Sequence, residues 1–328
     1  MNGTAILVEG LTKRFGDVVA LDGIDFEVPT SSVFGLLGPN GAGKTTAVRI
    51  LATVLAPDGG RAEVLGHDVV RQAEDVRYRI GLAGQYAAVD PNLTGRENLR
   101  LIGRLTQLPR KAIESRATEI LERFGLAHAA ERPVRTYSGG MRRRLDVGAA
   151  LVHRPPVLFL DEPTTGLDPE GRSELWEVIR ELVSDGTTVL LTTQYLEEAD
   201  RLADRVVVVD NGRVIADDTP TALKSKLGST VTELGFADAS DAAQAEEVIA
   251  RLGDVRAERD GMTVRVSSDD GARVLIAVLR ELDGHGIVPD TLTVREPSLD
   301  DVFLTLTGRH VEEEPAADER TLEQVGAR

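Results

Sequence analysis

A glycine-rich stretch with one lysine, GPNGAGKTT at residues 38–46, offers the first candidate chemistry. It follows the apolar run VFGLL and opens a helical pattern. Glycines let the backbone turn so that successive N–H groups point inward, and the start of a helix adds donors for an anion. In the pattern G-x-x-x-x-G-K-[ST], these donors hold the phosphates of a nucleotide, lysine adds a charge and the hydroxyl ligates Mg²⁺. We predict nucleotide binding with Lys44 as the charge, Thr45 as a Mg²⁺ ligand, and the cradle formed by Gly38, Pro39, Asn40, Gly41, Ala42, Gly43, Lys44, Thr45 and Thr46.

Two adjacent acids end a second apolar run, PVLFLDEP at residues 156–163. The run predicts a strand in the sheet that ends at Asp161 and Glu162. Asp161 would hold Mg²⁺ indirectly, through the ligands that are bound to the ion. Glu162, one residue further on, could polarise a water that lies in line with the γ-phosphate, since a general base needs both reach and geometry. Alone, the pair could be a simple acidic cap of a strand. Together with GPNGAGKTT it indicates a nucleoside triphosphatase that uses ATP and Mg²⁺.

The stretch YSGGMRRRL, residues 137–145, places a second glycine turn before a helix. Ser138 and the N–H groups of Gly139 and Gly140 would form another anion site at a helix N-terminus. One chain rarely needs two phosphate cradles for one nucleotide, so we expect the second to serve the ATP of a partner copy in a head-to-tail homodimer. Taken alone, the turn could be only a helix start. For Arg142–Arg144 we favour a solvated helix face over nucleic-acid binding.

These motifs need an α/β scaffold to bring them together. Continuous apolar runs at VFGLLG, VLFLD and VLLTT predict buried parallel strands, and AILVEG and ALDGIDFEV predict antiparallel edge strands. Helical patterns alternate with them, as expected for a layered α/β domain. Residues of about 90–150 show helical periodicity and little strand signal. We therefore predict a domain over residues 1–220, with an antiparallel β subdomain and a helical subdomain.

A second, smaller α/β domain is predicted over residues 229–310. Strand and helix patterns alternate there, beginning with TVTELGFA and ending with SLDDVFLTLTG. Ser298 and Asp301 have the spacing of a capping box at the last helix. The polar segment 311–328 is expected to be an acidic, flexible tail. The domain could stabilise a dimer or regulate it, or be a passive extension.

The charge and composition restrict the partners. Residues 229–328 hold 22 Asp and Glu, 10 Arg and no Lys, so they carry −12 of the net charge of −16. That balance speaks against nucleic acid as a partner, since phosphate contacts need basic side chains. There are no cysteines, and no apolar run approaches the roughly 18–20 residues that span a bilayer. We expect a soluble cytoplasmic chain, with any membrane crossing supplied by a partner.

At this point residues 1–220 resemble the ATP-binding subunits of ABC transporters, with six motifs in the family's order. GPNGAGKTT looks like Walker A, FLDEPTTGLDP like Walker B with its D-loop, and YSGGM like the signature motif. The resemblance implies that Gln85, in GLAGQYAAV, touches Mg²⁺ and the attacking water. It implies that Phe15 stacks on adenine, although Phe15 taken alone could belong to the core. It also implies that Asp168 lies across a dimer interface near the partner's Walker A. The implied fold is a P-loop NTPase core of the ABC type.

Within that family the chain is similar to the daunorubicin-resistance type of drug-export ATPase. The similarity rests on LTGRENLRLIGRL, TTQYLEEADRLADRVVVVDNGRVIADDTP and the C-terminal REPSLDDVFLTLTGRH. It implies a separate integral-membrane permease of the ABC-2 type, a position at the cytoplasmic face of the membrane, and export of a drug, antibiotic or lipid-like compound. A soluble ABC ATPase without a permease and an importer ATPase subunit stay as alternatives.

One residue departs from the general pattern of the family. In the family, the end of this strand usually reads T-x-H, and the histidine senses the γ-phosphate. In this chain the same three positions read TTQ, so Gln194 stands where the histidine would be. A glutamine amide can donate to a phosphate oxygen but holds no titratable proton near neutral pH. Because Lys44, Gln85, Ser138 and Glu162 are all present, we predict slow hydrolysis with an altered switch. The alternatives are a chain that binds ATP without hydrolysing it, and a Gln194 that is only a polar surface residue.

Overall fold

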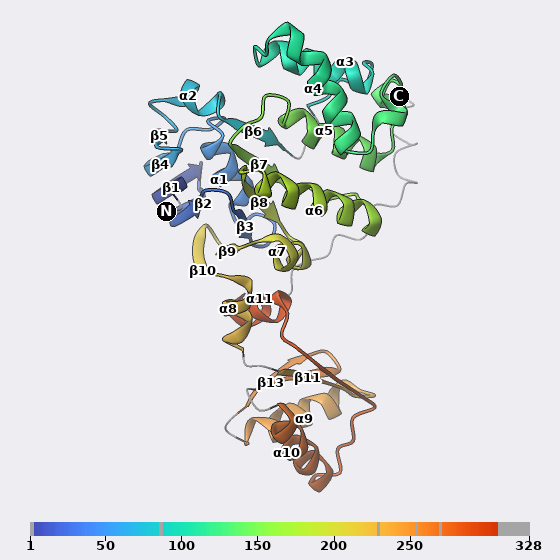
Figure 1. Cartoon of the computed structure of the whole chain (residues 1–328). Helices are drawn as coiled ribbons and strands as arrows, with labels where there is room; N and C mark the ends of the chain where they lie inside the picture. Colours follow the sequence, from blue (N-terminus) through green and yellow to red (C-terminus); the bar gives the residue numbers. More distant parts are fainter. Residues whose placement is uncertain (1–2, 85–87, 228–229, 253–254, 269–270, 308–328) are drawn as a thin grey trace, which may run out of the picture. The chain divides into compact units, whose positions relative to one another are not determined.

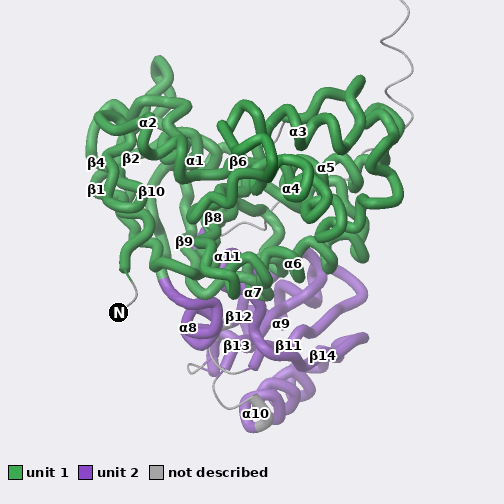
Figure 2. The backbone as a smooth tube through the Cα atoms, turned by 45° about the horizontal axis from the view of Figure 1, so that its top comes forward, with its two compact units in different colours: residues 1–217, 311–328 green, residues 218–310 purple. Residues whose placement is uncertain are grey.

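The computed structural model describes residues 3–84, 88–227, 230–252, 255–268 and 271–307. The chain divides into two compact units, with the boundary between Asp217 and Asp218 (Figures 1 and 2). We describe each unit by itself. No helix in the described ranges is long and apolar enough to cross a membrane.

A six-stranded sheet forms the centre of the first unit (Figure 1). Its order is β10-β9-β3-β8-β7-β6. The strands are β3 (Val33–Leu37), β6 (Ile80–Ala83), β7 (Val157–Asp161), β8 (Thr188–Thr193), β9 (Arg205–Asp210) and β10 (Arg213–Asp218). Strand β3 runs parallel to β8 and β9, and β7 runs parallel to β6 and β8. The three apolar runs predicted as buried parallel strands are thus β3, β7 and β8, and this prediction is confirmed.

The continuous apolar character of these strands follows from burial on both faces. In β7, Val157 and Phe159 belong to one core cluster, whereas Leu158 and Leu160 belong to the other. Successive side chains of a strand point to opposite faces, so a strand covered on both sides must be apolar at every position. Every residue of β7 is accordingly buried.

A separate four-stranded sheet has the order β2-β1-β4-β5. It contains β1 (Thr4–Phe15), β2 (Val18–Pro29), β4 (Gly59–Val64) and β5 (His67–Asp68). Strand β1 pairs antiparallel with both β2 and β4, which confirms the predicted antiparallel pairing. Only β2 is an edge strand; the predicted edge position of β1 is wrong, because β1 lies between β2 and β4. The apolar pattern did not predict β4, because its sequence GGRAEV begins with two glycines and a charge.

Helices form the rest of the first unit, and the expected helical segment is α3 (Gly95–Leu105), α4 (Arg110–Arg123) and α5 (Gly139–Ala150). Thr94 and Glu97 form a capping box that begins α3. These helices pack through the core cluster that also covers one face of β7. The remaining helical elements are α1 (Lys44–Leu51), α2 (Ala73–Arg77), α6 (Pro169–Ser184), α7 (Leu196–Leu202) and the 3₁₀ turns η1 (Ala127–Ala129) and η2 (Val134–Thr136).

The second unit holds a four-stranded antiparallel sheet of order β12-β13-β11-β14. Its elements are α8 (Pro220–Ser225), β11 (Thr230–Gly235), α9 (Ala239–Ala250), β12 (Arg256–Asp260), β13 (Thr263–Ser268), α10 (Gly271–Gly284), β14 (Thr291–Arg295) and α11 (Leu299–Thr307). From β11 to β14 this is the β-α-β-β-α-β order of ferredoxin-like domains. The sequence did not predict β12, since this edge strand, RAERD, has no apolar alternation.

An ion-pair cluster ties the start of α11 to the sheet of the second unit. Arg295 donates to both carboxylate oxygens of Asp301, at 2.6 and 2.8 Å, and to Glu233 at 2.8 Å. Asp301 also accepts from the Ser298 N–H at 2.7 Å, so the predicted capping box is confirmed. Burial alone would raise the pKa of Asp301, but Arg295 and Ser298 lower it overall.

We expect Arg295→Ala to lower the free energy of unfolding of the second unit by about 2–3 kcal/mol, because it leaves a mostly buried carboxylate without its cation. Since the Asp301 pKa is lowered by folding, the contribution exists above the ordinary aspartate value of 3.8 and is lost as the pH falls through the folded-state pKa. Hydrogen exchange of β14 and α11 in the full chain measures the change. The exposed Arg251→Ala is the control, and an equal effect of both would contradict the prediction.

Candidate functional site

The predicted motifs meet at one edge of the central sheet. Strands β3, β8, β7 and β6 are neighbours and run parallel, so their carboxyl ends lie at the same edge. The glycine-rich loop follows β3, Gln194 follows β8, and Asp161 and Glu162 stand at the end of β7. Ligands of open α/β sheets bind at this edge. Gln85 follows β6 in sequence but lies outside the described residues.

Close backbone contacts explain two glycines of the loop after β3. Gly38 and Gly43 have φ angles of 151° and 110°, in the region that side chains rarely adopt. A Cβ at Gly38 would lie 2.2 Å from the Val209 carbonyl oxygen, and one at Gly43 would lie 2.3 Å from that of Ala20. Hence only glycine fits at position 38, beside β9, and at position 43, beside β2.

Lys44, at the first position of α1, is buried and holds the loop together. Its Nζ donates to the carbonyl oxygens of Gly38 at 2.7 Å and Pro39 at 3.1 Å. Burial lowers the Lys44 pKa, and the charges of Glu162 and Asp161 partly offset that shift. The ammonium therefore stands in the field of both carboxylates, where an anionic phosphate would compensate its burial.

Asp161 and Thr45 come together as a magnesium site would require. The Thr45 hydroxyl donates to Asp161 Oδ1 at 3.2 Å, and the Thr192 hydroxyl donates to the same oxygen at 2.5 Å. These hard oxygen donors suit Mg²⁺, which also keeps phosphate and water ligands. Within the described ranges, no group of three or more His, Cys, Asp or Glu side chains could hold a metal by itself.

Glu162 has an unusual backbone. Its φ angle is 52°, in the left-handed region, which costs a non-glycine residue about 1 kcal/mol or more. The Glu162 N–H donates to the Thr192 carbonyl oxygen at 3.1 Å and lies 3.2 Å from the Thr192 hydroxyl. This bend turns the chain out of β7 directly after Asp161.

Gln194 is buried, with only 6% of its surface exposed, so it is not a polar surface residue. Its Oε1 has no hydrogen-bond partner among the described residues. An unpaired buried amide costs about 1–3 kcal/mol. Since oxygen and nitrogen of an amide are interchangeable by a flip, the group can present its N–H₂ to an anion instead. The site thus fits a nucleotide phosphate at Gln194.

The Ser-Gly-Gly turn begins α5 in an exposed position. Ser138 caps the helix by accepting from the Met141 N–H at 3.2 Å. Asp168 caps α6 by accepting from the Gly171 N–H at 3.0 Å, and it is exposed too. Both residues therefore have structural roles as helix caps. Their contacts with a partner's nucleotide stay predictions.

Phe15 lies at the end of β1 and is half-exposed, with 49% of its surface accessible. It is therefore not a core residue, which excludes the alternative interpretation of this position. The Lys13 ammonium lies 5.6 Å from the centre of its ring. An exposed aromatic face of this kind is free to stack on a base, as the resemblance implies.

The predicted solvated face at Arg142–Arg144 is correct only for Arg142. Arg143 is largely buried and Arg144 forms an ion pair with Glu174 at 2.7 Å. The error arises because α5 packs inside the unit, so consecutive helical positions face different surroundings. Glu198 was not predicted as a site residue; it is buried and accepts from the Trp176 Nε1–H at 3.2 Å. Burial raises the pKa of Glu198, although bonds from Thr193 and Trp176 oppose this.

The ABC transporter family model matches residues 21–165. The chain is 53% identical to the daunorubicin resistance ATP-binding protein DrrA2 of Streptomyces coeruleorubidus, over 97% of this chain and 99% of that protein. It is 49% identical to the daunorubicin/doxorubicin resistance ATP-binding protein DrrA of Streptomyces peucetius, over 98% and 96%. The chain belongs to the ABC transporter ATP-binding proteins. Among them it groups with the daunorubicin-resistance proteins, as its motifs predicted.

The solved structure of an ATP-binding subunit of an ABC transporter is similar to the chain with a TM-score of 0.62 and 27% identity. The match covers 68% of this chain and 92% of that one. The predicted fold class is thus confirmed, and so is the enzyme class: the chain is an ATPase of the ABC family. Nucleotide binding follows from this membership.

Proposed function

We propose that the chain is the ATP-hydrolysing subunit of an exporter, which drives a separate integral-membrane permease of the ABC-2 type. Its cargo would be a drug, an antibiotic or a lipid-like compound, because similar ATP-binding proteins carry resistance to daunorubicin and doxorubicin. The subunit would lie at the cytoplasmic face of the membrane. The convergence of Lys44, Asp161 and Gln194 at one edge of the sheet carries the hydrolytic part of the proposal.

The proposed roles follow from the positions of the described residues and, for Gln85, from the resemblance alone. Lys44 and the loop 38–46 hold the β- and γ-phosphates, and Phe15 stacks on adenine. Glu162 polarises the attacking water, together with Gln85. Thr45 and Asp161 would hold Mg²⁺, with Gln85 as a further ligand, and the ion would supply positive charge that neutralises the charge developing in the reaction. Gln194 donates to the γ-phosphate from the end of β8.

Two copies would enclose two ATP molecules head to tail. Ser138, Gly139 and Gly140 of one copy would contact the ATP on the partner's loop, and Asp168 would lie beside it. The exposure of Ser138 and Asp168 supports this arrangement, since both can reach a second copy. The closed dimer would have contacts through the γ-phosphate that the open one lacks, and this difference would drive the permease.

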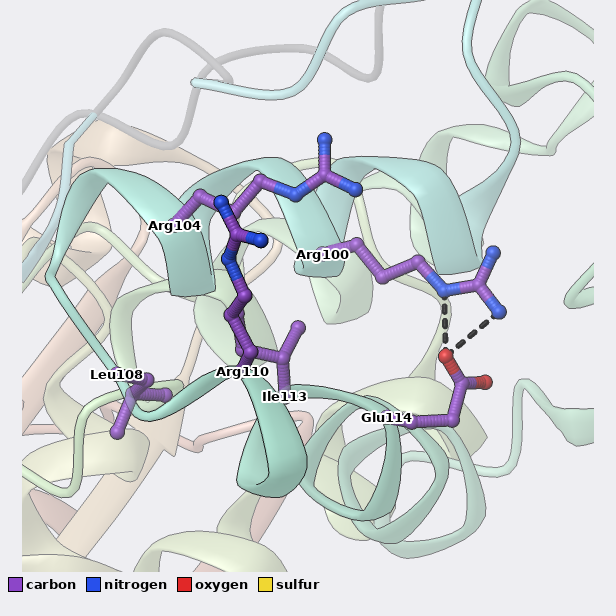
Figure 3. A pocket seen from close by; sticks show the side chains of 6 residues that line it. All are labelled: Arg100, Arg104, Leu108, Arg110, Ile113 and Glu114. Carbon is purple, nitrogen blue, oxygen red and sulfur yellow. Dashed lines mark hydrogen bonds and ion pairs between the residues drawn. The ribbon is translucent and has the colours of Figure 1, made fainter.

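A basic pocket between α3 and α4 supports a partner that docks on the helical part. Figure 3 shows Arg100, Arg104 and Arg110 around this pocket, which Leu108, Ile113 and Glu114 complete. Arg100 pairs with Glu114 at 2.6 Å, whereas Arg104 and Arg110 have no acidic partner in the part of the chain that the structure describes. Leu101 and Leu105 are exposed on the same helix. An amphipathic acidic segment of a permease would suit this surface.

Steady-state hydrolysis of MgATP by the purified chain tests the altered switch. We expect the wild type to turn over and Gln194→Ala to be about 10²-fold slower, by analogy with other donors that bond the transition state. The exposed Gln244→Ala is the matched control and should leave the rate unchanged. Equal rates for Gln194→Ala and the wild type would exclude the γ-phosphate contact. An inactive wild type that regains turnover with permease-bearing membranes would show that the permease is required.

Co-purification with the membrane separates the transport functions from a soluble role. The exporter and importer alternatives both require a permease, whereas a soluble ABC ATPase does not. We expect the chain to sediment with membranes that contain a neighbouring ABC-2 permease and to remain in the supernatant without it. Sedimentation that is independent of the permease would contradict the proposed partner. Inside-out vesicles expose the cytoplasmic face of the membrane, so ATP-dependent uptake of the transported compound into them corresponds to export from the cell. Such uptake would exclude the importer alternative.

A further inference from the structure

Arg143, in the first half of α5, forms hydrogen bonds with the backbone of the bend at the end of β7. Its guanidinium donates to three successive carbonyl oxygens, at 2.8 Å from Asp161, 3.0 Å from Glu162 and 3.0 Å from Pro163. It also donates to the carbonyl oxygen of Gly84, the residue after β6. Five fixed donors on a planar group make this multiple contact possible.

Asp146 lies one turn further along α5 and completes the arrangement. Its Oδ1 accepts from the Ala88 N–H at 2.6 Å, and its Oδ2 lies 3.5 Å from Arg143 Nη1. Only 1% of the Asp146 side chain is exposed. Together, the two side chains hold Gly84 and Ala88, which are the described residues on either side of the stretch that contains Gln85.

These contacts hold the backbone of the proposed base, Glu162, and of Gly84 and Ala88. Glu162 stands in the left-handed region, and Arg143 binds its carbonyl and the ones before and after it. A strained residue keeps its conformation only if its surroundings hold it there. A general base also loses efficiency steeply when it is displaced, with about 10²-fold for 1 Å. Neither Arg143 nor Asp146 needs to touch the nucleotide for this effect.

We propose that Arg143 and Asp146 form a positioning pair, which fixes Glu162 and both sides of the Gln85 stretch for hydrolysis. The pair rests on the proposed roles of Glu162 and Gln85. Because α5 begins at the Ser138 turn, the pair also connects the surface proposed to meet a partner's ATP with the residues that act on the chain's own ATP. The Ser138 turn and the Arg143–Asp146 pair both lie on α5, so a shift of this helix would move them together.

Arg143→Lys tests the proposal, because lysine keeps the charge but cannot donate to four carbonyl groups at once. We expect kcat for MgATP hydrolysis to fall at least 10-fold, while the Kd for a fluorescent ATP analogue stays within twofold of the wild type. The kcat of Asp146→Asn should fall less, because asparagine retains an acceptor for the Ala88 N–H. The exposed Arg142→Lys is the matched control and should leave both quantities unchanged.

The Trp176 emission of the variants, from the chain's single and buried tryptophan, shows whether they have folded. A folded Arg143→Lys with wild-type kcat would overturn the proposal. So would a loss of kcat and ATP affinity in parallel, since that pattern indicates general damage. In single-turnover assays, Arg143→Lys should add little to Glu162→Gln if it acts through Glu162, whereas additive losses would contradict this.

The two levels of inference fail in different ways. If Glu162→Gln hydrolyses ATP like the wild type, the proposed role of Glu162 is wrong whatever Arg143 does. If Glu162→Gln is inactive and Arg143→Lys is fully active, only the positioning pair is wrong. The cysteine-free chain allows one more check, with a single environment-sensitive label at Ala88→Cys. We expect Asp146→Ala, which removes the acceptor of the Ala88 N–H, to alter the label's response to MgATP, and an unchanged response would contradict the Ala88 contact.

Discussion

Replacing Glu162 with glutamine is expected to reduce ATP turnover about 10³-fold while ATP binding is preserved. A general base contributes roughly 10²–10⁴-fold, and the amide cannot take up the proton of the attacking water. The side chain keeps its size and stands on the same bend after β7. Because hydrolysis would reopen the enclosed dimer, the variant should also accumulate as an ATP-bound dimer on a sizing column.

The control for this experiment is Glu177→Gln, which removes an exposed carboxylate from α6. It should keep the wild-type rate and elute as the wild type does. A Glu162→Gln variant that turns over at the wild-type rate would exclude Glu162 as the base. A slow variant that remains monomeric with ATP would retain Glu162 as the base and contradict the head-to-tail dimer.

Lys44→Ala is expected to weaken ATP binding about 100-fold and to bring hydrolysis below detection. The ammonium is buried beside the carboxylates of Asp161 and Glu162, and its bonds to a phosphate are each worth about 1.5–3 kcal/mol. Without it the phosphates would lie near two negative charges and would lose one of their two proposed cationic partners, the other being Mg²⁺. Titration with a fluorescent ATP analogue measures the loss.

The fold should survive this substitution, since burial lowers the Lys44 pKa and the charge is costly to bury without an anion. We therefore expect Lys44→Ala to unfold at the wild-type temperature or slightly above it when no nucleotide is added. The exposed Lys111→Ala should change neither binding nor stability. A Lys44→Ala variant that binds ATP normally would show that the loop backbone alone holds the phosphates.

The strands of the central sheet and its motifs could be read from the sequence because their patterns are local. Burial on both faces forces apolar residues at every position of β3, β7 and β8, and the loop after β3 needs glycines where Val209 and Ala20 approach. The strand β12 was not predicted, because an edge strand needs little apolar surface and its sequence shows no apolar alternation. In the second unit, the capping box at Ser298 was readable since it involves residues three apart.

The sequence by itself determined the family, the nucleotide chemistry and the candidate base, because these rest on short motifs with rigid spacing. Only the tertiary structure decided what surrounds them. It showed that Gln194 is buried with an unpaired amide oxygen and that Arg143 contacts two strand ends rather than solvent. Neighbouring positions of a helix cannot be told apart until packing places each one, and contacts between residues 84 and 143 depend on how the chain returns on itself. Spacing along the sequence does not contain that information.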